Sequence, residues 1–279
     1  MSMRIATWRR FKRRKTAIFG LSLYAVIILI AALAPYLSPH DPNAQDIPKR
    51  LTPPSAESPL GTDEFGRCIL SRVLFGGRIS LYIGVISVAI SAGIGTLLGL
   101  ISGFFGTKVE AVIMRIVDIM LCFPGILLAL IIVSTLGRDI QYVMIAVGVS
   151  GVPNYARMVR GAVLTVKENE YIEAARAAGA SSFSIIGRHV LPNIFAIIII
   201  LTTLSLPGSI LSAAALSFIG LGVQPPTAEW GRMLGDGRAY IDTAWWISTF
   251  PGLMIFVTVI SINLFGDGLR DALDPRLKT

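Results

Sequence analysis

Small, acidic and hydroxyl side chains gather in one stretch of the second half of the chain, and they suit contact with another protein. Residues 170–178 are rich in Ala and Glu, which are strong helix formers. Gly179 can supply the left-handed residue that ends such a helix, and Ser181 or Ser182 can cap a second helix, which must finish before Pro192. The resulting helix–turn–helix has an uncharged face that lets the backbone of another protein approach closely. A segment that only connects two helices through water would not need such an uncharged face. That face consists of Ala174, Ala175 and Ala178.

A second set of polar side chains lies within an otherwise apolar run. Four hydroxyl residues follow one another at offsets 0, 3, 7 and 10, which places them on one face of a helix. Hydroxyl groups both donate and accept hydrogen bonds, so the stripe could line a passage for a polar solute. Small polar residues also serve ordinary packing between membrane helices, and this interpretation is favoured. The candidate pathway residues are Thr202, Ser205, Ser209 and Ser212.

The sequence contains no recognisable catalytic or metal-binding pattern. His40 and His189 are far apart in the chain, and no phosphate-binding loop, zinc-protease motif or nucleophile elbow occurs. Cys68 lies in a polar stretch and Cys122 in an apolar one, so they indicate neither a disulfide framework nor a metal site. We therefore expect no enzymatic activity, no metal and no cofactor bound by this chain.

One ionisable pair lies inside an apolar run. Arg115 and Asp118 are three residues apart, so on a helix their side chains can pair with each other. Because a residue near a helix end can reach the interface, a structural ion pair is favoured over a role in transport or catalysis.

The elements that carry these residues must cross a membrane. Hydrophobic residues make up 53% of the 279 residues and charged residues only 15%, against about 25% in a soluble domain. A bilayer core of about 30 Å needs roughly 20 apolar residues as helix. Each uncharged run can hold one span, and its continuous apolar character also excludes a β-barrel. The runs are 16–40, 79–107, 119–137, 140–156, 189–228 and 243–266.

The pattern predicts an all-α membrane protein with six transmembrane helices, all with approximate ends. With six helices, both termini share a side, and on that side 16 Lys and Arg residues accumulate against 8 on the other. By the positive-inside rule both termini are then cytoplasmic, and the net charge of +8 reflects topology rather than nucleic-acid binding. The long loop at about 158–192 is then cytoplasmic as well. The predicted helices are 17–37, 80–103, 112–136, 140–157, 194–218 and 245–266.

Two long segments, about 38–79 and 219–244, lie outside in this topology. In the first, Thr62 or Asp63 could cap a short amphipathic helix that rests on the outer interface, with its arginines offset from an apolar stripe. This anchoring role is favoured over direct contact with an external protein. In the second segment Glu229 and Trp230 are candidates for the external mouth, although Trp at an interface is often only a membrane anchor.

Four motifs together make a family resemblance specific. Glu173-Ala-Ala-x-x-x-Gly179, followed after nine residues by His189-x-Leu191-Pro192, resembles the EAA loop of ATP-binding-cassette (ABC) importer permeases. The Arg-His-x-Leu-Pro form is similar to the dipeptide, oligopeptide and nickel branch. The remaining three motifs of that branch are Leu60-Gly-Thr-Asp-Glu-Phe-Gly-Arg67 with Ile69-Leu-Ser-Arg72, Leu216-Ser-Phe-Ile-Gly-Leu-Gly-Val-Gln-Pro-Pro-Thr-Ala-Glu-Trp-Gly231, and Gly266-Asp-Gly-Leu-Arg-Asp-Ala-Leu-Asp-Pro275. Cys68 departs from the branch, which usually has Asp there.

The resemblance implies a type I importer permease of the second-subunit kind in a bacterial or archaeal inner membrane. Its partners would be a homologous permease, two cytoplasmic ATPases that bind ATP and Mg, and an external or periplasmic binding protein. The cargo would be a di- or oligopeptide, including glutathione-like peptides. Residues 1–79 would carry the basic N-terminus, first span and external segment, and residues 80–279 the five-helix core. The coupling residues implied are Glu173, Ala174, Ala175, Gly179, Leu191 and Pro192.

Other classes of protein remain as alternatives. A secondary transporter or channel should show inverted repeats, several broken helices or a deeply buried titratable pair, whereas only Pro207-Gly208 interrupts a span. An intramembrane enzyme would need paired catalytic residues. Within the family, a nickel chelate is a less favoured cargo than a peptide.

Overall fold

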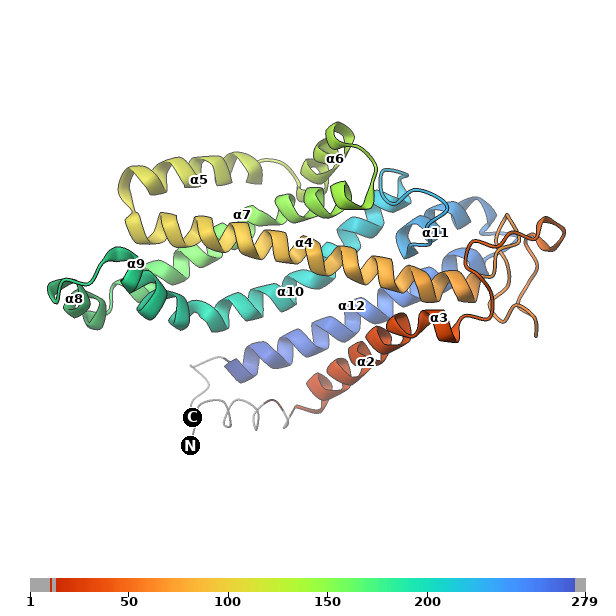
Figure 1. The fold of residues 1–279 in the computed structure, drawn as a ribbon, viewed down its shortest axis with the longest axis horizontal. Coiled ribbons are helices and arrows are strands. Elements are labelled where there is room, and N and C mark those ends of the chain that lie inside the picture. The colour runs from red at the N-terminus through yellow and green to blue at the C-terminus, as the bar shows by residue number, and fades with distance from the viewer. Residues whose placement is uncertain (1–10, 12–13, 274–279) are drawn as a thin grey trace.

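The computed structural model describes residues 11 and 14–273, and these form a bundle of long helices without a β-strand. Most of the N-terminal basic cluster and the last residues of the chain lie outside the described residues. Figure 1 shows the long helices running side by side, with short helices at both ends. The long elements are α2 (Lys15–Ala32), α4 (Ile69–Phe105), α5 (Thr107–Leu121), α6 (Gly125–Leu136), α7 (Ile140–Lys167), α10 (Leu191–Phe218) and α12 (Trp246–Leu273). The short ones are α3 (Ala34–Leu37), η1 (Ile47–Lys49), α8 (Glu170–Ala177), α9 (Ser182–Ile185), η2 (Ile186–Val190), α11 (Trp230–Gly237) and η3 (Arg238–Tyr240).

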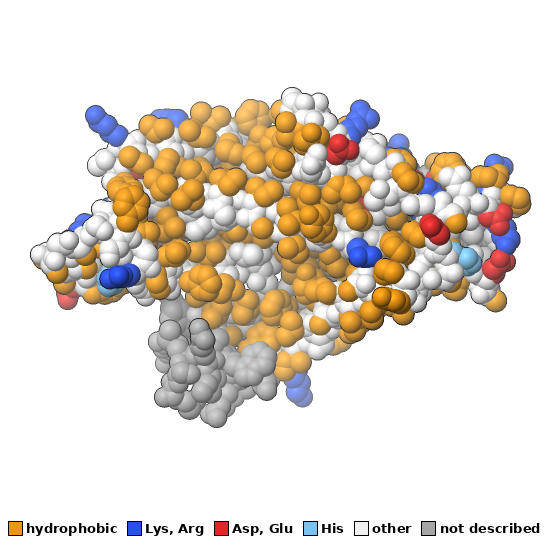
Figure 2. Space-filling view, viewed as in Figure 1, with side chains coloured by type: hydrophobic (Ala, Val, Ile, Leu, Met, Phe, Trp, Pro, Cys, Tyr) orange, Lys and Arg blue, Asp and Glu red, His pale blue; other side chains and the backbone are white. Residues whose placement is uncertain are grey.

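The surface of the bundle matches a membrane protein. Hydrophobic side chains cover its middle, and most charged side chains in view gather toward the two ends (Figure 2). Among the described residues four helices are long and apolar enough to cross a membrane, counting α9 through α10 as one. A fifth crossing results if the bent pair α5–α6 is one span. α7 is not in that set, although its 28 residues are about 42 Å long and exceed a bilayer core.

The first and last long helices pack against each other. The guanidinium of Arg14, directly before α2, lies 2.7 Å from the carboxylate of Asp271 near the end of α12. Gly20 of α2 faces the α12 backbone so closely that a Cβ there would lie 2.7 Å from the carbonyl oxygen of Ser261. The start of α2 and the end of α12 therefore lie together at one end of the bundle, the end where Figure 1 also shows α8 and α9.

The helix expected at 80–103 begins earlier than expected. α4 starts at Ile69 and continues without interruption to Phe105, so the expected interfacial helix is its first turns, and the division proposed at residue 79 is not a break in secondary structure. Inside the bundle α4 lies against α7 with backbones in close approach, because a Cβ on Gly99 would come within 2.7 Å of the carbonyl oxygen of Ala156. The Ser91 hydroxyl donates to the carbonyl of Gly148 at 2.6 Å and adds a polar link between these helices.

The span expected at 112–136 is broken. α5 ends at Leu121, α6 begins at Gly125, and the two are bent by 92°. Pro124 stands at the break, where it lacks a backbone donor and its ring disfavours a helical residue before it. α6 packs into the core through Ala129 and Val133, whereas Val117 is the one buried residue of α5. α5 therefore lies at the edge of the bundle.

α7 and α10 are longer or more regular than expected. α7 extends to Lys167, ten residues beyond the expected end, and carries Pro153 within it. α10 runs through Pro207-Gly208 as one helix, as the sequence suggested for this only slightly broken span. Two residues separate the end of α7 from the start of α8, so the helix–turn–helix is a direct extension of the bundle.

Candidate functional site

The turn between α8 and α9 has the geometry that the sequence predicted. Gly179 has φ +81°, a left-handed conformation that side chains rarely adopt. Its N–H donates to the carbonyl of Arg176 at 2.9 Å, and the N–H of Ala180 donates to that of Ala175 at 3.0 Å. This pair of bonds is a Schellman motif, which satisfies the last carbonyls of α8. The Ser181 hydroxyl then accepts from the N–H of Ser184 and caps α9, as expected.

The helix pair is anchored to the bundle by an apolar cluster. Ile172 of α8 and Ile185 of α9 are fully buried against the ends of α4, α7 and α10. Ala175 is half-buried against the same cluster, so it does not share the outward alanine face that the sequence suggested. Ala174 and Ala178 do remain exposed. The other exposed residues of the pair are Glu170, Tyr171, Glu173, Arg176, Ala177, Gly179, Ser181, Ser182 and Phe183, the last with 82% of its surface accessible.

The second helix of the pair does not finish before Pro192. Instead α9 passes through the π-helical turn η2 into α10, where Leu191 and Pro192 form the first turn. A π-turn widens the helix and accommodates the missing donor and the ring of proline. The side-chain amide of Asn193 donates to the carbonyl of His189 at 2.6 Å and satisfies one of the acceptors at this junction.

The four hydroxyl residues of the predicted stripe all lie on α10 and are all half-buried. The Thr202 hydroxyl donates to the carbonyl of Ile198 in its own helix at 2.8 Å. Gly208, within the stripe, faces open space, since a Cβ built there has no neighbour within 4 Å. The arrangement is compatible with both packing and a pathway, so the stripe stays a prediction. Its members are Thr202, Ser205, Ser209 and Ser212.

The expected pairing of Arg115 with Asp118 is wrong. Asp118 on α5 instead accepts from the guanidinium of Arg157 on α7 at 2.7 Å, and about two turns earlier on α5 Glu110 pairs with Arg160 of α7. The sequence argument considered only neighbours on the same helix, whereas α7 places two arginines opposite α5. These two ion pairs tie the edge helix to the bundle.

A buried charge cluster at the opposite end of the bundle was not predicted. We call this end the distal lobe (residues 38–82 and 219–245). Asp63 closes a tight turn by accepting from the N–H groups of Phe65 and Arg67, each at 2.9 Å, and its other oxygen pairs with the Arg67 side chain. Arg67 and Arg72 are 4% and 3% exposed, so they are not the outward arginines of a surface helix. The cap expected at Thr62 or Asp63 is also absent, because Cys68 is the residue before α4.

Arg72 connects three parts of the distal lobe. Its guanidinium lies 3.5 Å from the Asp63 carboxylate and donates to the carbonyls of Pro42 at 3.1 Å and Pro226 at 3.4 Å. A signal for this role existed in the Thr-Asp-Glu-Phe-Gly-Arg motif, whose Asp and Gly favour a turn. The sequence carried no signal for the other two partners of Arg72, Pro42 and Pro226, which lie 30 and 154 residues away from it in the chain.

Glu229 and Trp230, expected at an external mouth, are each 1% exposed. Glu229 caps α11 by accepting from the N–H groups of Gly231 at 3.0 Å and Arg232 at 2.8 Å, and it accepts from the Ser80 hydroxyl at 2.9 Å. The Trp230 indole donates to the carbonyl of Val73 at 2.9 Å. Their side chains therefore hold α11 against α4 and offer no surface to a partner in this structure.

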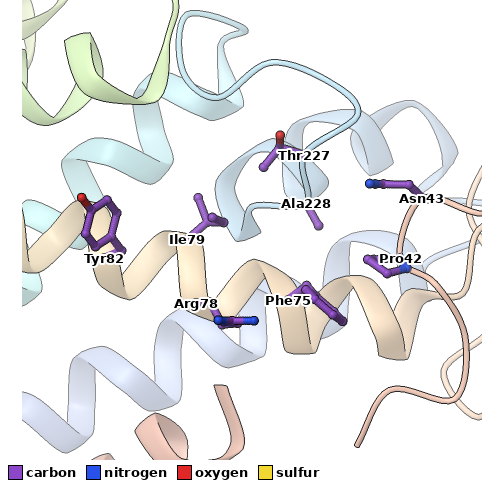
Figure 3. A pocket seen from close by; sticks show the side chains of 8 residues that line it. All are labelled: Pro42, Asn43, Phe75, Arg78, Ile79, Tyr82, Thr227 and Ala228. Atoms are coloured by element: carbon purple, nitrogen blue, oxygen red, sulfur yellow. The ribbon is translucent and has the colours of Figure 1, made fainter. Parts of the chain in front are cut away.

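A cavity of about 410 Å³ opens beside these residues at the surface of the distal lobe. Figure 3 shows Phe75, Arg78, Ile79 and Tyr82 on α4, with Pro42 and Thr227 on neighbouring stretches of the chain. Among the described residues, no group of three or more His, Cys, Asp or Glu side chains is arranged to hold a metal ion. The cavity is lined by Pro42, Asn43, Phe75, Arg78, Ile79, Tyr82, Thr227 and Ala228.

The sequence of this chain matches two known protein families. Residues 95–279 match the model of the binding-protein-dependent transport system inner membrane component. The chain belongs to this family. Residues 2–54 also match the N-terminal transmembrane domain of oligopeptide transport permease C. As a member of this inner membrane component family the chain is a transport component rather than an enzyme, as the sequence predicted.

Individual relatives of this inner membrane component span nearly its whole length. It is 48% identical over 277 residues to the di/tripeptide transport system permease protein DppC of Pseudomonas aeruginosa, covering 97% of this chain and 91% of that one. It is 44% identical over 273 residues to the glutathione transport system permease protein GsiD of Pectobacterium atrosepticum, covering 98% and 91%.

A solved structure shares the fold. An inward-facing form of the MetNI methionine ABC transporter contains a chain that superposes with a TM-score of 0.61 at 21% identity, covering 74% of this chain and 98% of that one. The type I ABC importer permease fold that the sequence resemblance implied is therefore confirmed.

Proposed function

We propose that this chain is one of two permease subunits of an ATP-driven importer and forms half of a passage for di- and oligopeptides. The observation that carries the peptide assignment is the full-length similarity to di/tripeptide and glutathione transport permeases. A homologous second permease supplies the other half, and an external binding protein delivers the cargo. ATP and Mg bind to two separate cytoplasmic ATPases, and this chain itself binds no cofactor.

The α8–α9 pair is the docking element for the ATPase in this proposal. Two properties support that role. The pair is held rigidly, because Ile172 and Ile185 fix it to the ends of three long helices. It also exposes small residues and a large aromatic, Phe183, on its outward side, which gives a partner both close backbone approach and an apolar anchor. Glu173, Ala174 and Gly179 lie on that outward side, and Leu191 and Pro192 at the junction behind it.

The chain crosses the membrane six times in this proposal, and both termini are cytoplasmic. The spans are α2, α4, the bent pair α5–α6, α7, α10 and α12. An even number of crossings is supported by the ion pair of Arg14 with Asp271, since it joins the start of α2 to the end of α12. Both lie at the same end of the bundle as α8 and α9 (Figure 1), so the distal lobe faces the outside.

The test is reconstitution of the complex in liposomes. The chain is purified together with the subunits that associate with it, and uptake of labelled L-alanyl-L-alanine is measured with and without ATP and the loaded binding protein. We expect uptake only when ATP and all subunits are present. Robust uptake by this chain alone, driven by an ion gradient, would instead identify a secondary transporter and refute the proposal.

A further inference from the structure

We propose that the cavity on the distal lobe is a binding site for the free C-terminal carboxylate of a short peptide, with Arg78 as its anion-binding residue. The proposal rests on the proposed function, because it takes the cargo to be a peptide and the distal lobe to face outside.

Arg78 is a cation without an anion of its own. Its side chain is exposed on α4, and among the described residues no carboxylate lies within ion-pair distance of it. Its guanidinium carbon lies 6.0 Å from the centroid of the Phe75 ring. The other arginines of this lobe's core, Arg67 and Arg72, are both paired with Asp63. Arg78 is therefore free to take an anion from outside the chain.

The cavity has the size and the chemistry for a small peptide. A volume of about 410 Å³ falls within the range of roughly 300–1,000 Å³ that small-molecule sites occupy. Phe75, Arg78, Ile79 and Tyr82 follow one another at helical spacing, so α4 presents aromatic, aliphatic and cationic groups on one wall (Figure 3). A guanidinium can bind both oxygens of a carboxylate at once, which selects that group over a neutral amide.

The remaining groups suit the rest of a peptide. The side chains of Asn43 and Thr227 contribute an amide and a hydroxyl, which can donate to or accept from a peptide bond. The Tyr82 ring, 53% exposed, offers a face to an ammonium group. A zwitterionic peptide therefore finds a partner for each end and for its backbone, whereas an apolar solute would leave the guanidinium unpaired.

The walls of the cavity are fixed before any ligand arrives. Arg72 lies six residues before Arg78 on α4, faces inward, and donates to the carbonyls of Pro42 and Pro226. These are the residues next to Asn43 and Thr227, so one buried side chain positions both opposing walls. On the far side Ala228 is 5% exposed and is followed by Glu229, which caps α11. Such preorganisation reduces the entropy lost when a ligand binds.

The experiment compares two ligands that differ only in the carboxylate. The complete complex is placed in nanodiscs without its binding protein, and the affinities of L-alanyl-L-alanine and L-alanyl-L-alanine amide are measured by equilibrium binding. We expect the wild type to prefer the free acid by about tenfold or more, as a charge-assisted bidentate contact implies. Arg78→Gln should reduce this preference to less than about twofold, and Arg78→Lys should leave an intermediate value because the charge remains without the fork.

Arg50→Gln is the matched control, because Arg50 is an exposed arginine of the same lobe that does not line the cavity. It should keep the full preference. An unchanged preference in Arg78→Gln, or no preference or no binding in the wild type, overturns the proposal. If Arg78→Gln instead weakens only the docking of the loaded binding protein, the anion belongs to that protein. An effect confined to nanodiscs with phosphatidylglycerol would assign it to a lipid phosphate, and either result also overturns the proposal.

The two proposals fail differently. ATP-driven uptake of L-alanyl-L-alanine by the wild-type complex tests the peptide import function and does not depend on Arg78. If uptake occurs and Arg78→Gln leaves both uptake and ligand preference unchanged, the site assignment is wrong and the function stands. If no peptide is taken up under any condition, the function itself is wrong.

Discussion

Replacing Gly179 by valine tests the backbone conformation of the turn between α8 and α9 without disturbing its packing. A Cβ at this position has no heavy atom within 4 Å, so a larger side chain meets no steric obstacle. What remains is the cost of holding a residue with a side chain at φ +81°, about 1–2 kcal/mol and more for a β-branched residue. That strain is relieved if the two bonds of the turn, from Gly179 to Arg176 and from Ala180 to Ala175, are given up.

Giving up those bonds reorients α9 relative to α8 and lowers the population of the docking-competent surface. A cost of 1–2 kcal/mol corresponds to a factor of about 5–30 in an equilibrium. We expect Gly179→Val to insert normally in the membrane while ATP-driven uptake in liposomes falls by about 5–30-fold. Gly179→Asn should retain most activity, because Asn tolerates the left-handed region.

Gly187→Ala is the control for this series. Gly187 lies in η2 of the same segment, is exposed, has no atom within 4 Å of a built Cβ, and does not have a positive φ. It should behave as wild type in membrane amount, in co-purification with the ATPase and in uptake. Normal uptake by Gly179→Val, or an equal loss in Gly187→Ala, would refute the coupling role of this turn.

Three further predictions concern the ion pairs, the distal lobe and the topology. Asp118→Arg and Arg157→Asp should each reduce uptake, because each leaves two like charges facing each other between α5 and α7. The double variant restores opposite charges and should recover most of the lost uptake; no recovery would argue against the pairing. Burial raises the pKa of Glu64 above its usual 4.5, with the nearby Asp63 charge adding to the effect, so folding stability should fall as pH rises above 4.5. Glu64→Gln should therefore flatten the dependence of melting temperature on pH, and an unchanged slope would contradict this. In a cysteine-free background Asn43→Cys should react with an impermeant thiol reagent added outside sealed cells and Ser182→Cys should not; external labelling of position 182 would overturn the six-span topology.

The local features of the α8–α9 pair were predictable because each depends on neighbours in sequence. A glycine after an alanine-rich helix predicts a left-handed turn, and Gly179 has that φ. A serine after the turn predicts a cap, and Ser181 provides it. Which alanines face outward was less predictable, because Ala175 is turned toward an apolar cluster built from three other helices.

The distal lobe was mispredicted because its partners come from distant parts of the chain. Three arginines near the start of α4 suggested a surface helix, since charge and exposure usually coincide. Arg72 is buried because its acceptors are the carbonyls of Pro42 and Pro226, which no local pattern indicates. Trp230 was predicted at the external mouth because it lies in the second long external segment of the predicted topology. It is buried because Gly76 and Gly77 leave room for its ring on α4: a Cβ on Gly77 would lie 2.8 Å from that ring.

α4 links the α8–α9 pair to the proposed peptide site. Its end beside α8 and α9 contributes Leu100 and Phe104 to the cluster that holds them, and its distal part contributes Arg78 to the cavity. The 22 residues between Arg78 and Leu100 span about 33 Å of uninterrupted helix, and α7 packs along that length with glycines of α4 in close approach. Because closely packed helices deform little, a movement at one end of the α4–α7 pair is transmitted to its other end. A displacement of the helix pair would therefore move α4, α7 and the walls of the cavity as one body, whereas α5 contributes little buried surface and is held to α7 by its ion pairs.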